Sequence, residues 1–452
     1  MDKDWFWEKI KAYGSRPAIV ALGRSHTYED LYNRVDEFKK SINEIEKGEV
    51  VAILSDYSFD SVALFFALKD NKNIIVPITN QVQEEIDERI IESNSSFVLS
   101  LHKGKLVIKK NIDKSEEVHS FVQGLVDDER SGLILFSSGS TGKPKTMLHD
   151  LEAMMEMYKE RKAKRFCFLV FLMFDHIGGL NTLFNCLSMG TKIVFPENRD
   201  AKYICNLIEK EQIHILPTSP TFLNLILISQ AYLKNDLSSL KMITYGTEPM
   251  PESLLVKLKQ VFPKVKLLQT FGTSETGILQ ARSKSSESTH IKIKDPNTEY
   301  KIVNGELWLK SKTRIVGYLN ASMEQFTNDG WYKTGDLVEE MEGDYIKIIG
   351  RIQELINIGG QKVLPLEVEA VLLELDEIAD CLVYPASNTI TGQSVVADVQ
   401  LVNELTRKDA TRLIRKHCKS KLDAYKIPTK IYFLDNISFI NRYKKDRKIV
   451  RK

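Results

Sequence analysis

The strongest constraint on the fold is an alternation of short apolar runs with stretches of helical length along the first half of the chain. Runs such as EVVAILS and NIIVPIT are rich in β-branched residues and are separated by the helical pattern FDSVALFFALKDN. Thr27 followed by Asp30 indicates a capped helix start. The pattern predicts strands at 49–55, 73–79, 191–196 and 213–220, and helices at 59–71 and 201–212. Such alternation predicts an α/β fold of parallel-rich sheets packed with helices.

The pattern changes near Asn304, where short strands and turns replace the alternation. The stretches GELWLKS, TRIVGYLN and GDLVEEMEGDYIKIIG predict a small β-rich element that closes the large part. A helix, two strands, a second helix from about Thr406 to Leu422 and a last strand then predict a compact α+β unit of roughly 100 residues. We expect an N-terminal domain, 1–350, and a C-terminal domain, 354–452, with their boundary near Gln353.

Composition argues against several classes of function. The net charge of +2 is too close to neutral for a nucleic acid to be the partner of the whole chain. The five cysteines are scattered, as is typical of reduced thiols in the cytoplasm, and the eight histidines form no zinc motif. The most apolar run, 166–174, is about half the length that spans a bilayer, and the first residues lack the apolar region of a signal peptide. We expect a cytoplasmic protein without a membrane span.

The stretch LILFSSGSTGKPK at 133–145 has the composition of a phosphate-binding loop. Glycines and small hydroxyl residues after a strand let backbone N–H groups surround phosphate oxygens. The stretch is not a P-loop, because Ser137 occupies the position of the first glycine and Pro144 follows Lys143 where a hydroxyl would bind Mg²⁺.

Together with motifs further along the chain, this loop resembles that of the acyl- and aryl-adenylate-forming superfamily, which includes acyl-CoA synthetases, adenylation domains of peptide synthetases and luciferases. The other motifs follow in the order of that family. They are YGTEPMP (245–251), QTFGTSETG (269–277), GWYKTGDL (330–337) and GRIQELINIGGQKVLPLEVE (350–369). The resemblance implies ATP and Mg²⁺ as cofactors, and a mobile C-terminal domain that rotates about a hinge at Gln353.

The resemblance also implies a set of ATP-binding residues. Glu275 would hold Mg²⁺, which takes oxygen ligands and is commonly bound by protein carboxylates and substrate phosphates together. Asp336 would bind both ribose hydroxyls, because a carboxylate can accept two O–H bonds, and Arg351 would reach the ribose side. The full set is Ser137, Ser138, Gly139, Ser140, Thr141, Gly142, Lys143, Lys145, Gly246, Thr247, Glu248, Phe271, Gly272, Thr273, Ser274, Asp336 and Arg351.

The last family motif, usually G-K-[VI]-x-R, has a divergent counterpart in FINRYKKDRKIVRK. Aligning Asp446 and Arg447 with its end places Lys444 at the catalytic lysine, with Tyr443 in place of the usual glycine; Lys445 is the alternative. Such a lysine would stabilise charge between the carboxylate and the α-phosphate as pyrophosphate leaves. A solvated basic tail stays open as a different interpretation, because seven of the last eleven residues are Lys or Arg.

The acid pocket is expected along FDHIGGLNTLF at 174–184. His176 matches the histidine of the F-H-x-x-G segment in acid ligases and joins Lys444 and Glu275 as a candidate catalytic residue; a histidine held by backbone groups is the alternative. Asp175 lies one position early for the aspartate that binds the α-ammonium in amino-acid-activating members, so we expect an aliphatic or aryl acid. The expected pocket residues are Asp175, His176, Gly179, Tyr245, Phe271 and Gly277.

The implied reaction forms acyl-AMP and pyrophosphate and then a thioester. Gly359 and Gly360 would leave room for a pantetheine arm, which CoA and acyl carrier proteins share, whereas Asn357 replaces a usual lysine. The hinge loop resembles the CoA-ligase form, which favours an acid–CoA ligase. Loading of a phosphopantetheinyl carrier protein by a stand-alone enzyme is the alternative. A non-catalytic nucleotide- or adenylate-binding member is another, and Gln353, Asn357 and Tyr443 are the departures that favour it.

Overall fold

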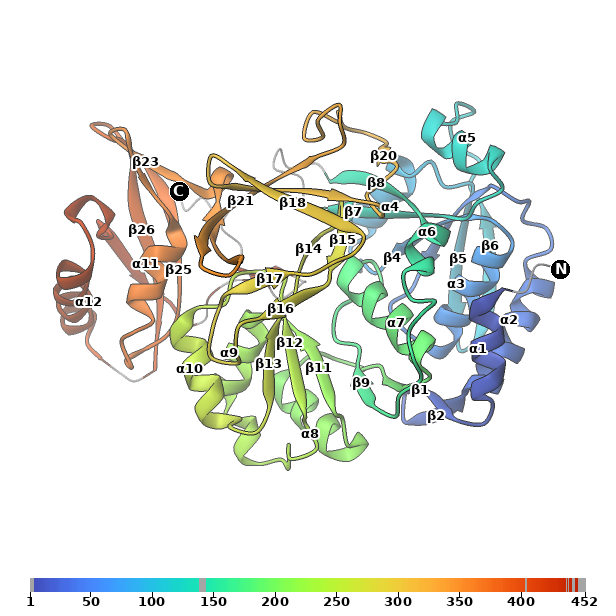
Figure 1. Cartoon of the computed structure of the whole chain (residues 1–452), viewed down its shortest axis with the longest axis horizontal. Coiled ribbons are helices and arrows are strands. Elements are labelled where there is room, and N and C mark those ends of the chain that lie inside the picture. The colour runs from blue at the N-terminus through green and yellow to red at the C-terminus, as the bar shows by residue number, and fades with distance from the viewer. Residues whose placement is uncertain are drawn as a thin grey trace.

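The computed structural model describes residues 4–137, 144–402, 405–435 and 437, and the backbone of 439–440 and 444–445. The chain forms two seven-stranded sheets with interleaved strands, a β-rich layer and a C-terminal α+β unit (Figure 1). No helix in the described part is long and apolar enough to cross a membrane.

The first large sheet is parallel in its centre and antiparallel at its edges. Its strands, in spatial order, are β20 (Gly317–Tyr318), β8 (Lys145–Asp150), β7 (Gly132–Ser137), β4 (Ile74–Ile78), β3 (Val50–Leu54), β5 (Phe97–His102) and β6 (Lys105–Lys110). β7 and β8 are a hairpin pair, so the candidate phosphate loop joins two antiparallel strands.

The second large sheet is parallel except at one edge. Its order is β13 (Lys266–Gln269), β12 (Met242–Tyr245), β11 (Ile215–Thr218), β9 (Cys167–Leu169), β10 (Lys192–Val194), β1 (Pro17–Ala21) and β2 (Arg24–Thr27). Parallel strands bring their carboxyl ends to one edge, and this edge faces the candidate site.

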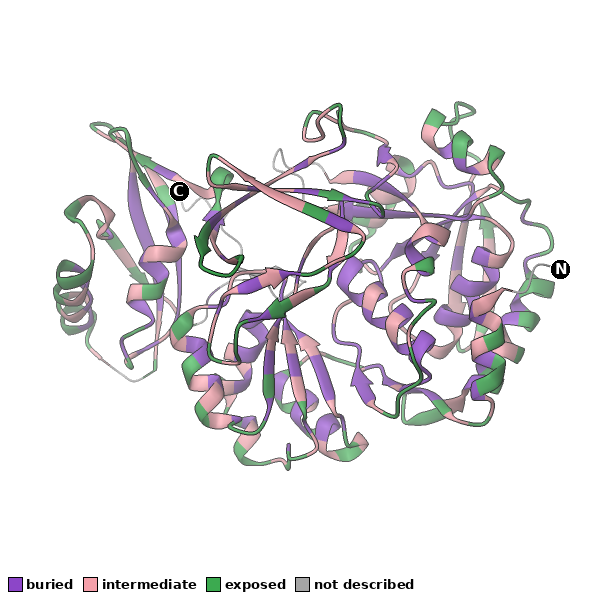
Figure 2. Cartoon of the chain, in the orientation of Figure 1, coloured by how far each residue is buried: buried purple, intermediate pink, exposed green. Residues whose placement is uncertain are grey.

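The main hydrophobic core joins both large sheets through two helices. The helices of this part are α1 (Trp5–Tyr13), α2 (Tyr28–Ser41), α3 (Phe59–Asp70), α4 (Gln83–Glu92), α5 (Ser120–Asp127), α6 (Leu151–Glu156), α7 (Ile177–Met189), α8 (Ala201–Glu211), α9 (Pro220–Ser229), the 3₁₀ turn η1 (Ala231–Leu233) and α10 (Glu252–Val261). α3 is buried along its whole middle and α7 along most of its length, as expected for helices enclosed on several sides (Figure 2).

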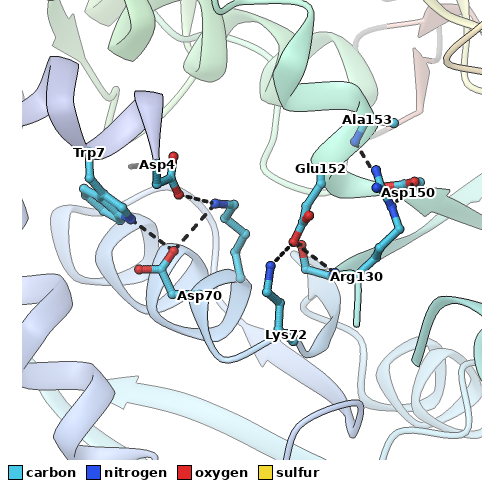
Figure 3. A network of polar contacts seen from close by, with 10 residues as sticks. Asp4, Trp7, Asp70, Lys72, Arg130, Asp150, Glu152 and Ala153 are labelled. Atoms are coloured by element: carbon cyan, nitrogen blue, oxygen red, sulfur yellow. Dashed lines mark hydrogen bonds and ion pairs between the residues drawn. The ribbon is translucent and has the colours of Figure 1, made fainter. Parts of the chain in front are cut away.

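A polar network fixes the N-terminal helices on this core (Figure 3). Trp7 donates its indole N–H to Asp70 at 3.1 Å, and Asp4 pairs with Lys69 at 3.1 Å, which ties α1 to α3. Glu152 pairs with Lys72, and Arg130 makes two bonds of 2.6 and 2.9 Å to Asp150. Asp150 also caps α6, so this part of the network anchors the strand that follows the phosphate loop.

A β-rich layer follows the second sheet. It contains the hairpin of β14 (Phe271–Thr273) and β15 (Gly277–Leu279) and a six-stranded antiparallel sheet. The order of that sheet is β16 (Ala281–Ser283), β17 (Ile291–Ile293), β22 (Tyr345–Arg351), β21 (Tyr332–Met341), β19 (Glu306–Ser311) and β18 (Thr298–Val303).

The C-terminal unit has a hydrophobic cluster of its own. Its elements are η2 (Ile352–Glu354), β23 (Ile356–Ile358), β24 (Gln361–Val363), α11 (Pro365–Leu372), β25 (Ile378–Asn388), β26 (Gly392–Leu401), α12 (Arg407–Lys421), η3 (Ala424–Lys426) and β27 (Lys430–Phe433), followed by the two-residue strands β28 (Phe439–Ile440) and β29 (Lys444–Lys445). Asn224 of α9 donates to the Ala379 carbonyl at 3.1 Å across the junction with the large part. The proposed division at Gln353 stays a prediction.

The α/β fold class and the alternating elements are confirmed. β3, α3, β4, β10, α8 and β11 lie within their predicted ranges, and Thr27 caps α2 in a box with Asp30. The predicted start of the β-rich element near Asn304 was wrong, because short strands begin at Phe271. β14 to β17 have only three residues each, which is too short for an alternating pattern to show.

Candidate functional site

A cavity of about 610 Å³ separates α7 from one face of the second sheet and reaches the end of β7. This volume is in the range of natural ligand sites. The helix contributes residues three or four apart, which share one face, and the sheet contributes alternate residues. The helix residues are Ile177, Gly178, Asn181, Thr182, Asn185 and Met189; the facing residues are Phe166, Phe168, Ile215, Pro217, Met242 and Thr244.

At one end of this cavity, two tyrosines lie beside the carboxylate of Glu275, which is 9% exposed. The Tyr318 hydroxyl donates to Glu275 Oε1 at 3.0 Å, and the Tyr332 side chain is close enough for its pKa to respond to the Glu275 charge. Burial raises the pKa of both tyrosines, and the nearby Glu275 charge raises it further. Both phenols therefore stay neutral, and Tyr318 orients the carboxylate.

This arrangement fits Mg²⁺ bound together with phosphates. The described residues hold no group of three or more His, Cys, Asp or Glu side chains that could bind a metal alone. Mg²⁺ commonly takes one or two protein carboxylates and completes its shell with phosphate oxygens and water. Glu275 is the described residue that would hold the ion here.

The two described residues that flank the phosphate loop lie opposite each other. Ser137 ends β7 and pairs in register with Lys145 at the start of β8. Lys145 Nζ donates to Gln325 Oε1 at 3.0 Å and lies 4.8 Å from the centre of the Tyr318 ring. Lys145 is thus linked to the group that positions Glu275. The predicted residues Ser138, Gly139, Ser140, Thr141, Gly142 and Lys143 lie outside the described part.

Asp336 and Arg351 form an ion pair next to this end. They are partners in the β21–β22 ladder, and Arg351 Nε donates to Asp336 Oδ1 at 2.9 Å. Asp336 is 3% exposed, and its charge raises the pKa of Arg351. Both residues line a second cavity of about 170 Å³, together with Thr247, Glu248 and Phe271. Thr247, Phe271 and Arg351 border both cavities, so the two are adjacent.

The turn after β12 has a constrained backbone. A Cβ on Gly246 would lie 2.4 Å from Thr270 Oγ1, so only glycine fits without rearrangement. Thr247 has φ of 72°, a left-handed conformation that is rare for a β-branched residue, and Glu248 accepts the Thr221 backbone N–H at 2.7 Å. Strained backbone of this kind clusters at ligand sites.

The β14–β15 hairpin presents the remaining predicted ATP residues. Phe271, Gly272, Thr273 and Ser274 all border the large cavity. The hydroxyls of Thr273 and Thr276 lie 2.9 Å apart and brace the turn that carries Ser274 and Glu275. A Cβ on Gly272 would lie 2.5 Å from the Gly277 carbonyl oxygen, so the two strands approach closely here.

His176 lies at the cavity wall and also caps α7. Its Nδ1 accepts the Gly178 backbone N–H at 3.0 Å. This contact agrees with the alternative interpretation, in which backbone groups hold the histidine. It also fixes the imidazole ring at the start of α7, whose face forms one wall of the cavity.

Four of the expected pocket residues do not border the cavity. Asp175 is 3% exposed and pairs with Arg89 at 3.5 Å, and Tyr245 is packed in the core of the second sheet. A Cβ on Gly179 would lie 2.3 Å from the Met173 carbonyl oxygen, so this glycine serves helix packing. Gly277, with φ of 80°, ends the hairpin turn. Of the six expected residues, the structure brings His176 and Phe271 to the cavity.

The residues expected at the hinge and near the acceptor thiol lie in the described part of the chain. Gln353 lies in η2 and borders the large cavity. Gly359 and Gly360 form the two-residue turn between β23 and β24, both with positive φ, and Asn357 accepts the Gly360 N–H at 3.0 Å. Asn357 therefore stabilises this turn. Lys444 is paired with Ile440 through the backbone, and Tyr443 lies outside the described residues.

Several residues at the cavity were missed by the sequence analysis. Gln325 and Tyr332 border the cavity, and Tyr318 lies just behind them. Tyr318 donates to Glu275 and Gln325 accepts from Lys145, and a signal was present, since Tyr318 and Tyr332 lie inside quoted motifs. Arg161 and Lys164 border the other end of the cavity, and their polar stretch between α6 and β9 carried no motif.

Comparisons with known proteins agree with this geometry. A family model described as "AMP-binding enzyme" matches residues 6–319, and one for the "AMP-binding enzyme C-terminal domain" matches residues 367–439. The chain is 29% identical to acyl-CoA synthetase 7 of Caenorhabditis elegans, covering 90% of this chain and 81% of that protein. It is 28% identical to the probable CoA ligase CCL5 of Humulus lupulus, covering 86% and 82%.

Solved structures share the fold. A crystal structure of the anthranilate CoA ligase AuaEII with anthranoyl-AMP superposes with a TM-score of 0.83, at 20% identity, over 98% of this chain and 95% of that one. The o-succinylbenzoate CoA synthetase of Bacillus subtilis with ATP and magnesium gives a TM-score of 0.76 at 20% identity, over 98% of both chains.

Proposed function

Since this chain belongs to the AMP-binding enzyme family, we propose that it activates a carboxylic acid with Mg·ATP and transfers the acyl group to CoA. The observation that carries this proposal is the single cavity that joins Glu275 and Lys145 at one end to the α7 wall at the other. A phosphate-binding end and a mainly apolar acid channel must meet where a carboxylate attacks a phosphorus atom.

The reaction has two balanced halves. A carboxylate oxygen attacks the α-phosphorus of ATP, the bond from that phosphorus to the leaving pyrophosphate breaks, and acyl-AMP forms. The thiol sulfur then attacks the acyl carbon, the bond from that carbon to the phosphate oxygen breaks, AMP leaves and the thiol proton passes to water.

Several side chains would act in the first half-reaction, the formation of acyl-AMP. Bound Mg²⁺ would neutralise phosphate charge and favour pyrophosphate as a leaving group. Glu275 would hold the ion, with its orientation set by the hydrogen bond from Tyr318. Asp336 would accept from the ribose hydroxyls while paired with Arg351. We assign Lys444 to the charge that develops between carboxylate and α-phosphate.

The C-terminal unit would turn about Gln353 between the two halves. Its separate hydrophobic cluster and the short η2 connection support a rigid-body motion, and such motion is a known way to separate partial reactions. The turn at Gly359 and Gly360 would then face the acceptor thiol, since a Cβ on either glycine would have no atom within 4 Å.

The test is acid-dependent exchange between ATP and pyrophosphate, followed by thioester formation. We expect exchange with aliphatic or aryl acids and thioester formation with CoA. Thioester formation with a phosphopantetheinyl carrier protein but not with CoA would instead assign the carrier as acceptor. Nucleotide binding without exchange for any acid would contradict the proposal and favour a non-catalytic member.

We also propose a cytoplasmic location. All five cysteines lie in the described part, are buried and form no disulfide, as suits a reducing compartment. Recovery of the native protein in a cytosolic fraction would agree, and recovery in an organelle or a salt-washed membrane fraction would not.

A further inference from the structure

The end of the large cavity opposite Glu275 is bordered by two cations. Arg161 and Lys164 line it, and both lie on the segment between α6 and β9. Among the described residues, no carboxylate lies within 4.0 Å of either side chain in an ion pair, and Arg161 Nε is buried without a hydrogen-bond partner. A cation that borders a ligand cavity and lacks a carboxylate of its own is a candidate partner for an anion on the ligand.

The distance between the two ends can be taken from α7. His176 caps its first turn, and the preceding Asp175 pairs with Arg89, whose guanidinium lies 5.2 Å from the centre of the Phe136 ring, next to Ser137 at the reactive end. At the last turn, the Lys164 backbone N–H donates to the Met189 carbonyl at 2.8 Å. From residue 177 to residue 189 the helix rises about 18 Å, at about 1.5 Å per residue. The cations therefore face the far end of a long acid, well away from its reacting carboxylate.

The wall between the two ends is mainly apolar. Phe166, Phe168, Ile215 and Met242 line it from the sheet side. The polar exceptions are Asn181, Thr182, Asn185 and Thr244. Asn181 accepts from Tyr158 and the Thr182 hydroxyl donates to the Gly178 carbonyl, whereas the carboxamide oxygen of Asn185, one turn before Met189, has no hydrogen-bond partner in the described structure. A ligand that fits has an apolar body and a polar far end.

Hydrogen bonds to neighbouring elements hold the backbone at Arg161 in place. Lys9 of α1 donates its ammonium to the Arg161 carbonyl at 2.7 Å, and the Arg161 N–H donates to the Tyr158 carbonyl at 3.0 Å. The Tyr158 hydroxyl donates to Asn181 of α7 at 2.6 Å, which joins this segment to the helix wall. A segment tied to both α1 and α7 can place its cations reproducibly at the cavity end.

We propose that the acid is elongated and carries a second anionic group at its far end, which Arg161 and Lys164 bind. This inference rests on the proposed function and names its substrate class: α,ω-dicarboxylic acids, or acids with another distal anion of the same charge. Charge-assisted bonds to a carboxylate are the stronger class of hydrogen bond, and each contributes enough to change a rate ratio about tenfold.

The experiment compares straight-chain monocarboxylic acids with α,ω-dicarboxylic acids of equal length in the exchange assay. We expect the wild type to have a higher kcat/KM for the dicarboxylic member of the matching length. In the variant Arg161→Gln/Lys164→Gln, the ratio of dicarboxylic to monocarboxylic kcat/KM should fall at least tenfold. Lys162→Gln removes an exposed charge of the same segment that does not border the cavity, so the ratio should stay as in the wild type.

Lys164→Gln alone, at an exposed position, keeps the test decisive if the double variant does not fold. It should lower the ratio by several-fold. A wild-type ratio of one or below, or a ratio unaffected by both variants, would overturn the inference while exchange with monocarboxylic acids upheld the proposed function. Exchange with no acid at all would overturn both.

Discussion

At the scale of single residues, the candidate site depends on a few side chains that hold other side chains. Glu275, Lys145 and Asp336 could be assigned from motifs, because each lies in a short segment of distinctive composition. Tyr318 and Tyr332 lie inside such segments too, but their place beside Glu275, like that of Gln325 beside Lys145, comes from contacts between segments far apart in the chain, which no local pattern reveals. The same holds for Asp175, whose pairing with Arg89 takes it away from the cavity.

The hydrogen bond from Tyr318 to Glu275 gives the first prediction. Tyr318→Phe removes the hydroxyl that donates to this carboxylate at 3.0 Å, and a hydrogen bond to a charged group contributes about 1.5–3 kcal/mol. We expect kcat/KM for Mg·ATP to fall about tenfold, with a higher Mg²⁺ concentration needed for half-maximal rate. Exchange kinetics at several Mg²⁺ concentrations measure this. Tyr300→Phe, which removes a half-buried tyrosine hydroxyl on β18 away from Glu275, is the control, and an equal loss in both variants would speak against orientation of Glu275.

The assignment of Lys444 gives a second prediction. Lys444→Ala should abolish adenylation, because the charge developing at the α-phosphate loses its cation, whereas thioester formation from supplied acyl-AMP should stay nearly intact. Lys445→Ala is the matched control and should keep both half-reactions. If Lys445→Ala lost adenylation and Lys444→Ala did not, the roles of the two lysines would be exchanged.

At the scale of elements, the long patterned segments were predictable and the short ones were not. β3, α3 and β4 each carry a periodic pattern over five or more residues. The three-residue strands β14 to β17 take their structure from pairing with neighbours, which a local pattern does not reveal. One side of the cavity was predictable, because the segment that forms much of α7 was expected to line the acid pocket. The strands that form the opposite wall were not identified from the sequence.

β8 carries a buried histidine that should make stability depend on pH. His149 is 1% exposed, neither ring nitrogen has a hydrogen-bond partner in the described part, and burial lowers its pKa from 6.5 to about 4. The unfolded chain therefore binds a proton below pH 6.5 that the folded chain does not take up until about pH 4. The stabilisation is present above pH 6.5 and is lost as the pH falls, by about 2 kcal/mol at pH 5.

Urea unfolding at pH 7 and pH 5 tests this expectation. The loss of unfolding free energy between the two pH values should be about 2 kcal/mol smaller for His149→Leu than for the wild type. An equal loss in both proteins would show that His149 does not titrate differently on folding.

At the scale of the whole molecule, the C-terminal unit has a hydrophobic cluster of its own and follows the large part at η2, beside both cavities. Figure 1 shows the C-terminal unit, in orange and red, at one end of the molecule and joined to the rest next to β21. The α/β class and the order of the parts could be predicted from the sequence. The adjacency of Asp336, Arg351 and Thr247 could not, because it arises where separate sheets come together.

The proposed rotation at Gln353 gives a prediction for the half-reactions. Gln353→Pro would force Ile352 out of the helical region and stiffen the connection. We expect ATP–pyrophosphate exchange to be retained and thioester formation to fall at least tenfold, with Gln353→Ala as the control that keeps both. Rapid-quench measurement of each half-reaction separates the effects, and loss of exchange alone would argue against a hinge here.

The central claim is that a carboxylate attacks the α-phosphorus of ATP. The most direct measurement follows an acid labelled with ¹⁸O in its carboxylate through a complete turnover with CoA. The mechanism predicts AMP that carries one ¹⁸O atom, because the bridging oxygen of acyl-AMP comes from the acid and leaves with AMP. Unlabelled AMP, or ADP with the label in inorganic phosphate, would contradict the account.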